Sequence, residues 1–134
     1  MTSDITSNKI ILWADDDPDD LMIMKEVLNE MHYTYDIIEV QNGKQALDYL
    51  KSNKRNLPCL MILDMNMPIL SGRDTLSIIK KDPTYEPMPI VIFTTSNSEM
   101  DKTFCKKYNV DMITKPPAYN SLQQIIIRLL SYCK

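Results

Sequence analysis

Carboxylate side chains follow two short apolar stretches of this sequence, at the point where each stretch ends. Residues 59–63 run directly into Asp64, and residues 9–14 run into Asp15 and Asp16. Apolar runs of this length are typical of parallel strands covered on both faces, and ligands collect at the carboxyl ends of such strands. Asp64 alone would be equally compatible with the start of a turn. Because two runs end in the same way, we expect their carboxylates to meet at one edge of a sheet.

Two further apolar stretches also end in polar side chains. Residues 89–93 are followed by Thr94, and residues 110–114 are followed by Lys115. If a helix connects each strand to the next, every strand ends on the same side of the sheet. The hydroxyl group of Thr94 and the amine of Lys115 should then converge with the carboxylates.

Such a cluster has the composition of a phosphoryl-transfer site. Carboxylates packed within a few ångströms raise each other's pKa unless a cation lies among them. Oxygen ligands without histidine or thiolate favour a hard cation such as Mg²⁺, which also accepts a phosphoryl oxygen. A carboxylate can attack phosphorus, while Lys and Thr side chains stabilise the charge that develops on the phosphoryl oxygens. Each residue has an ordinary explanation by itself, as a helix cap, a strand end or a surface lysine, but together they indicate a reactive site.

Apolar spacing predicts the elements that must position this cluster. Asp17 and Pro18 are typical of a helix start, and Ser96 with Glu99 has the spacing of a capping box. Residues 82–88 are predicted to be a Pro-rich loop. The alternation of strands and helices predicts an α/β three-layer sandwich with one five-stranded parallel sheet. The predicted strands are 9–14, 35–40, 59–63, 89–93 and 110–114, and the predicted helices run from 17 to about 32, from 43 to about 51, over 72–81 and 97–107, and through 122–133.

Composition limits the functions open to the chain. Its 134 residues suffice for one domain, with residues 1–8 as a flexible lead and residues 9–134 as the domain. A formal charge of −3 and the lack of a Lys/Arg stripe argue against binding to nucleic acid or to an anionic membrane. No apolar segment reaches the roughly 20 residues that span a bilayer, and residues 1–8 do not resemble a signal peptide. We therefore expect a cytoplasmic location.

Neither the cysteines nor the histidine suggests a further site. Cys59, Cys105 and Cys133 are odd in number and far apart, which gives neither a disulfide framework nor a zinc-type pair. We predict that they are buried or inert thiols. His32 is the only histidine and has no partner at ligand spacing, so we expect no metal there.

In their order and spacing, the motifs closely resemble the receiver domain of bacterial two-component response regulators. The resemblance covers about residues 9–132 and implies a flavodoxin-like receiver fold with strand order 2-1-3-4-5. The motifs Asn42-Gly43, Ala46-Leu47 and Tyr49-Leu50 add a likeness to stand-alone receivers that partner phytochrome-type and other sensor histidine kinases. The motifs that carry the family resemblance are Asp15-Asp16, Asp64-Met65-Asn66-Met67-Pro68 with Gly72, Thr94-Thr95-Ser96 and Lys115-Pro116.

The resemblance implies how the acidic residues act. Asp64 would accept a phosphoryl group from the phosphohistidine of a sensor histidine kinase or a phosphotransfer protein. The reaction would depend on Mg²⁺, held by Asp64, by Asp16 directly, by Asp15 through water and by the backbone carbonyl of Asn66. Asn66 would also help to set how fast water removes the phosphoryl group.

The remaining motif residues would act on the phosphoryl oxygens. By resemblance, Thr94 would bind one of these oxygens and move on activation, and Ser96 would flank the group. Lys115 would pair with the phosphate. Its bond to Pro116 is expected to be cis, as in the family, and such bonds are rare enough to be a sharp check.

The sequence departs from the family pattern at Met112. Family members usually carry Tyr or Phe three residues before the lysine, and the ring swings inward as Thr94 moves. A flexible thioether can fill or vacate the same gap. We therefore expect a weaker or different signal to the face of the fourth helix, fifth strand and fifth helix, through which related receivers often form homodimers.

Two other functions stay open beside that of a single-domain response regulator. An inactive receiver would act purely as a binding module, although the complete Asp, Thr and Lys set argues against this. A phosphatase that forms an aspartyl phosphate would need a second Asp where Asn66 stands. We therefore expect a phosphoacceptor signalling protein that catalyses only its own phosphoryl transfer and dephosphorylation. It would signal through a protein surface that depends on phosphorylation.

Overall fold

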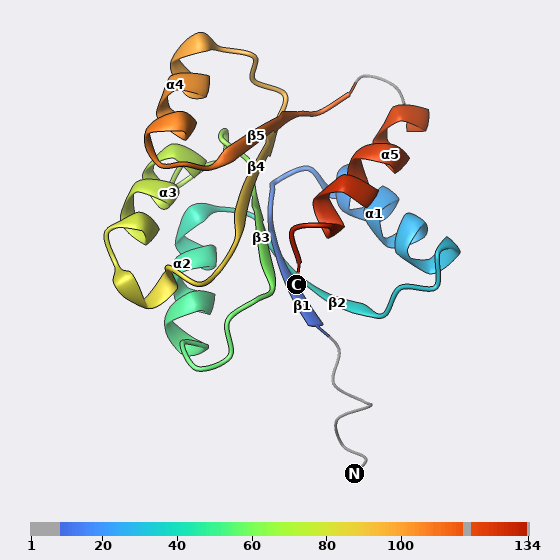
Figure 1. Cartoon of the computed structure of the whole chain (residues 1–134), viewed down its shortest axis with the longest axis horizontal. Helices are drawn as coiled ribbons and strands as arrows, with labels where there is room; N and C mark the ends of the chain where they lie inside the picture. Colours follow the sequence, from blue (N-terminus) through green and yellow to red (C-terminus); the bar gives the residue numbers. More distant parts are fainter. Residues whose placement is uncertain (1–8, 117–118, 134) are drawn as a thin grey trace.

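Five parallel strands form one sheet at the centre of the molecule (Figure 1). The structure is a computed structural model that describes residues 9–116 and 119–133. The strand order β2-β1-β3-β4-β5 and the parallel pairing confirm the predicted sheet, and each strand end lies within one residue of its prediction. The strands are β1 (Lys9–Ala14), β2 (Tyr35–Val40), β3 (Leu60–Leu63), β4 (Ile90–Thr94) and β5 (Asp111–Thr114).

Helices cover both faces of the sheet, which confirms the predicted three-layer sandwich. In Figure 1, α2, α3 and α4 lie on one side of the strands, and α1 and α5 lie on the other. None of the helices in the described part of the chain combines the length and apolar character that crossing a membrane requires. The helices are α1 (Pro18–Glu30), α2 (Gly43–Ser52), α3 (Gly72–Lys80), α4 (Glu99–Lys107) and α5 (Tyr119–Leu130).

Successive residues of β1 pack on opposite faces of the sheet. Ile11 and Trp13 belong to the core shared with α1 and α5, whereas Leu12 and Ala14 belong to the core shared with α2, α3 and α4. The central strands β3 and β4 are buried at every position. A parallel strand covered on both faces needs apolar side chains in both directions, so these strands appear in the sequence as continuous apolar runs.

Side-chain caps fix where the helices begin. Asp17 accepts the backbone N–H of Asp19 at 3.0 Å, which confirms the predicted start of α1. The predicted cap of α4 was wrong. Ser98, and not Ser96, accepts the N–H groups of Met100 and Asp101, so α4 begins two residues later than the capping-box spacing suggested.

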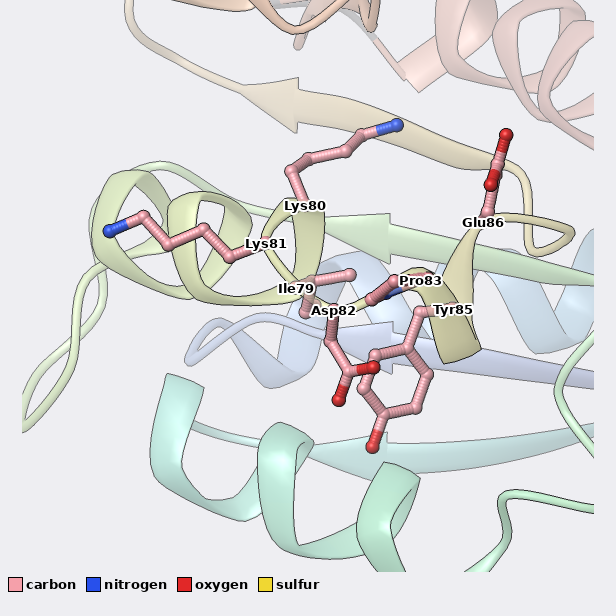
Figure 2. A pocket seen from close by; sticks show the side chains of 7 residues that line it. All are labelled: Ile79, Lys80, Lys81, Asp82, Pro83, Tyr85 and Glu86. Carbon is pink, nitrogen blue, oxygen red and sulfur yellow. The ribbon is translucent and has the colours of Figure 1, made fainter.

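The predicted loop 82–88 contains a short 3-10 helix, η2 (Pro83–Tyr85). Asp82 caps it by accepting the N–H of Thr84 at 3.0 Å, and Tyr85 buries its ring in the core. Figure 2 shows η2 directly after α3, lining a cavity of about 200 Å³. The loop is therefore anchored by one aromatic side chain.

A disulfide joins Cys59 to Cys133, so the prediction of inert thiols was wrong for this pair. Cys59 precedes β3 and its N–H bonds to the carbonyl of Ile10 at 2.8 Å, while Cys133 follows α5. Their Cα atoms are 4.8 Å apart despite a sequence separation of 74 residues. Parallel topology brings the chain back to the same edge of the sheet, and sequence distance does not reveal that approach. Cys105 is a free, buried thiol, as predicted.

Candidate functional site

Three carboxylates meet where β1 and β3 end. One oxygen from each of Asp15, Asp16 and Asp64 lies within 4.8 Å of the others. The backbone holds them together, because the N–H of Asp64 donates to the carbonyl of Ala14 at 3.0 Å. Asp15 and Asp64 are buried, with 4% and 7% of their surface exposed, whereas Asp16 faces solvent. The cluster is therefore open to ligands on one side.

Lys115 reaches into this cluster from the end of β5. Its Nζ lies 2.7 Å from an oxygen of Asp15 and 3.5 Å from an oxygen of Asp64. It also lies 2.8 Å from an oxygen of Asp20 on α1, and its side chain is only 9% exposed. Asp20 was not predicted to be part of the site. Its position in the first turn of α1, close after Asp16, could have suggested such a role.

Burial and charge shift the two ends of the central ion pair. Burial raises the pKa of the Asp15 carboxyl from 3.8 to about 6, against the opposing effects of Lys115 and of the Asp17 N–H. Burial alone would lower the pKa of the Lys115 ammonium. Hydrogen bonds to Asp15 and Asp20 and the charge of Asp64 outweigh that effect and raise it. Lys115 is thus a firmly charged cation among carboxylates.

Thr94 lies beside this ion pair at the end of β4. The backbone N–H of Lys115 donates to the Thr94 carbonyl at 2.7 Å, and the Thr94 side chain is fully buried. Its Oγ1 accepts the N–H of Ser96 at 3.2 Å. This bond leaves the hydroxyl proton of Thr94 free to be donated to another acceptor.

The loop after Asp64 approaches that residue closely. A Cβ atom on Gly72 would lie 1.9 Å from the carbonyl oxygen of Asp64, so only glycine fits here. Within the loop, Ile69 has φ 68° and the N–H of Leu70 bonds to the carbonyl of Pro68 at 2.7 Å. This is a γ-turn with a strained, β-branched central residue. This turn was not predicted from the sequence.

The carboxylates suit a hard divalent cation. Mg²⁺ binds oxygen at about 2.1 Å in octahedral geometry, so its ligands lie at most about 4.2 Å apart. The carboxylate oxygens lie within 4.8 Å of one another, which is close to the largest separation of Mg²⁺ ligands, and all the donor atoms are oxygens. Three carboxylate oxygens would supply at most half of an octahedral ligand set, and Mg²⁺ usually keeps several waters as further ligands. The Asn66 N–H lies 3.4 Å from an oxygen of Asp64, while metal binding by the Asn66 carbonyl stays a prediction.

Two of the predictions concern β5 and the residues directly after it, namely Met112 and the bond between Lys115 and Pro116. The described residues contain no cis peptide bond, so the predicted cis bond between Lys115 and Pro116 was wrong. A trans bond already lets Lys115 reach the carboxylates, so this backbone does not require the rarer isomer. Met112 pairs with Ile92 and packs against the core on the α4 side. A thioether therefore occupies the place where the family usually has an aromatic ring.

Comparisons with known proteins agree with this fold and site. Residues 11–127 match the response regulator receiver domain family. The chain is 30% identical over 128 residues to the probable methanogenesis regulatory protein FilR2 of Methanothrix harundinacea, covering 92% of this chain and 82% of that protein. It is 30% identical over 105 residues to the response regulator Rcp1 of Synechocystis sp., covering 75% of this chain and 71% of that protein.

Two solved structures of response regulators are also similar. The phosphorylated cyanobacterial phytochrome response regulator RcpA has a TM-score of 0.86 and 29% identity, with 95% of this chain and 94% of that chain covered. The Mn²⁺-bound form of Rcp1 has a TM-score of 0.83 and 28% identity, with 92% of each chain covered.

The chain therefore belongs to the response regulator receiver family. Receiver domains are signalling proteins whose activity depends on phosphorylation, and histidine kinases phosphorylate them. The predicted family, fold and general function are confirmed, and the acidic cluster is consistent with the divalent cation that the family binds.

Proposed function

We propose that Asp64 accepts a phosphoryl group from the phosphohistidine of a sensor histidine kinase or phosphotransfer protein. A carboxylate oxygen of Asp64 attacks phosphorus, the new O–P bond replaces the N–P bond, and the imidazole leaves with the electron pair. The observation that carries this proposal is the approach of Lys115 to both Asp64 and Asp15 within one buried cluster. In such a reaction, the charge of Lys115 would stabilise the negative charge that develops on the phosphoryl oxygens.

The neighbouring residues would divide the remaining work. Asp15, Asp16, Asp64 and the Asn66 carbonyl would hold Mg²⁺, which would neutralise phosphoryl oxygens when bound. Thr94 would donate its hydroxyl proton to one of these oxygens. Lys115 would pair with another oxygen, moving away from Asp15 as the charge on Asp64 grows.

The same proposal covers the setting of this reaction. We place the protein in the cytoplasm, although disulfides such as Cys59–Cys133 are rare in that compartment. Output would be a protein contact, with a homodimer through α4, β5 and α5 as one form, and without nucleic acid or membrane. Beyond its own phosphoryl transfer and dephosphorylation, the chain would catalyse no reaction. The predicted lead, residues 1–8, lies outside the described residues, and the proposed domain covers residues 9–134.

Phosphorylation by a small donor tests the assignment of Asp64. We expect wild-type protein to gain one acid-labile phosphoryl group in phosphoramidate and Mg²⁺, and Asp64→Asn to gain none, as measured by intact mass. Thr94→Ala should still be phosphorylated but should show a smaller conformational response. If wild type stays unmodified, or if Asp64→Asn is modified equally, the binding-module alternative takes precedence.

A further inference from the structure

Ser96 holds the connection between β4 and α4 at three points. Its N–H donates to Thr94 Oγ1 at 3.2 Å, and its own Oγ accepts the N–H of Ser98 at 3.3 Å. The same Oγ donates to Asp101 Oδ2 at 2.5 Å. The orientation of the Thr94 hydroxyl is therefore tied to a carboxylate on the first turn of α4.

Asp101 is in turn held by α3. Its second oxygen, Oδ1, pairs with the guanidinium group of Arg73, and its side chain is only 14% exposed. A carboxylate so little exposed needs its partner, because removal of that partner leaves a poorly solvated charge. Asp101 thus links the β4–α4 connection to α3 by a charged contact that has little access to water.

Arg73 is itself placed by the loop that follows Asp64. It comes directly after Gly72, whose backbone packs against the carbonyl of Asp64. Its guanidinium carbon also lies 4.7 Å from the centre of the Phe104 ring on α4. The contacts of Arg73 therefore connect the Asp64 loop with the same helix that carries Asp101.

From these contacts we infer that Arg73, Asp101 and Ser96 form a latch that positions Thr94 for phosphoryl binding and couples Thr94 to α4. The inference rests on the proposed phosphorylation of Asp64. Arg73 and Asp101 are positioning residues, because they touch the reacting group only through Ser96 and Thr94. Movement of Thr94 toward a phosphoryl group pulls on Ser96, and through Asp101 it pulls on α4.

The latch also provides a connection from Thr94 to an outer helix, which β5 lacks because residue 112 is not aromatic. Met112 is partly buried and packs against the core in place of an aromatic ring. The hydrogen bonds and the ion pair of the latch run along the other side of Thr94, through the start of α4. This chain therefore has a polar connection from Thr94 to its outer helix that does not depend on residue 112.

Variants of the latch residues test this role when both the rate of phosphorylation and the affinity for Mg²⁺ are measured. We expect Arg73→Gln and Asp101→Ala each to slow phosphorylation by phosphoramidate about tenfold, within the range that residues of a coupled network produce. Mg²⁺ affinity, followed by the fluorescence of Trp13, should stay unchanged. Arg73→Lys keeps the charge and should recover part of the rate. The matched control is Lys102→Gln, which removes the exposed pair of Lys102 with Glu99 on the same helix.

The double variant separates the latch from general damage to the fold. Because both residues act through Ser96, Arg73→Gln with Asp101→Ala should be no slower than the slower single variant. Ser96→Ala should reproduce the same loss without removing a charge. The latch is overturned if wild type and the folded variants are phosphorylated at rates within about twofold of each other, if the losses of the two single variants multiply in the double variant, or if Mg²⁺ affinity falls in parallel. Failure of wild type to take up phosphate would instead overturn the proposed function itself.

Discussion

The two edges of the sheet, where the strands begin and where they end, are held together by different interactions. At the amino edge, where the strands begin, the Cys59–Cys133 disulfide joins β3 to the segment after α5, and the Tyr132 hydroxyl donates to the Asp111 carboxylate. At the carboxyl edge, where the strands end, like charges are packed together around Lys115. One edge is closed by covalent and hydrogen bonds, and the other retains unbalanced charge. The difference separates the part of the molecule that maintains the fold from the part that binds ligand.

The charges at the carboxyl edge are consistent with the binding of a divalent cation. A single ammonium group, that of Lys115, lies among four carboxylates, those of Asp15, Asp16, Asp20 and Asp64. Lys115 offsets only part of their repulsion, and the raised pKa of Asp15 shows that burial still disfavours its charged form. A divalent cation would relieve the remainder.

Removal of Lys115 should produce the largest effect on this edge. In Lys115→Met, the buried Asp15 carboxylate loses its ion pair, and loss of one partner of such a pair typically costs about 3 to 5 kcal/mol. We expect the free energy of unfolding without Mg²⁺ to fall by about that amount, as measured by denaturant titration. Mg²⁺ should restore part of the loss, because a divalent cation can take over the compensation.

A surface lysine provides the control for that experiment. Lys44 pairs with Asp48 at 3.0 Å, but both side chains are mostly exposed, at 68% and 59%. Lys44→Met should therefore change stability by less than about 1 kcal/mol. If Lys115→Met is no more destabilised than this control, Lys115 does not balance the carboxylates in the folded protein.

Reduction of the disulfide at the amino edge should lower the free energy of unfolding by less than Lys115→Met does. It should leave phosphorylation unchanged. Reduction of the Cys59–Cys133 disulfide should lower the free energy of unfolding by about 2 to 4 kcal/mol, the usual range for such bonds. Cys59→Ser with Cys133→Ser should match the reduced wild type, and phosphorylation by phosphoramidate should keep its rate. Loss of phosphorylation on reduction would show that the two edges are not independent.

Thiol titration provides the check on the starting state. Unfolded, unreduced protein should react at Cys105 alone, because the other two of its three cysteines are joined. After reduction, all three should react. Reaction of all three before reduction would contradict the disulfide.

The contrast between the two edges also shows which features could be predicted from the sequence. The strands and the meeting of Asp15, Asp64 and Lys115 were predictable, because apolar runs that end in polar residues are local and the alternation of elements implies the topology. The disulfide pairing was not predictable in this way. Cys59 with Cys133 depends on tertiary approach, and no local pattern in the sequence marks it.

The start of α4 illustrates a second limit. Both Ser96 and Ser98 precede the helix at a spacing suitable for a cap, and the capping-box spacing to Glu99 predicted Ser96. In the structure, Asp101 takes the Ser96 hydroxyl and Ser98 caps the helix. The outcome depends on the ion pair between Asp101 and Arg73 on another helix, so propensity alone could not decide between the two serines.

Lowering the pH should progressively weaken Mg²⁺ binding at the carboxyl edge. Because the pKa of Asp15 is raised from 3.8 to about 6, the folded protein holds this proton more tightly than the unfolded chain does. The contribution of Asp15 therefore makes the metal-free protein less stable as the pH rises from 3.8 to about 6. Mg²⁺ binding has the opposite dependence, because it competes with this proton. Its affinity should be level above about pH 6 and fall by up to about tenfold per pH unit below it.

Trp13 offers a direct way to measure this competition. It is the only tryptophan and stands two residues before Asp15 in β1, so its fluorescence should report Mg²⁺ titrations at a series of pH values. Asp15→Asn cannot gain or lose the proton, so its weaker Mg²⁺ binding should depend much less on pH. An affinity that stays constant in wild type as the pH falls through about 6 would show that Asp15 is already ionised there. In that case Lys115 and the backbone N–H groups would stabilise the Asp15 carboxylate more than burial opposes it.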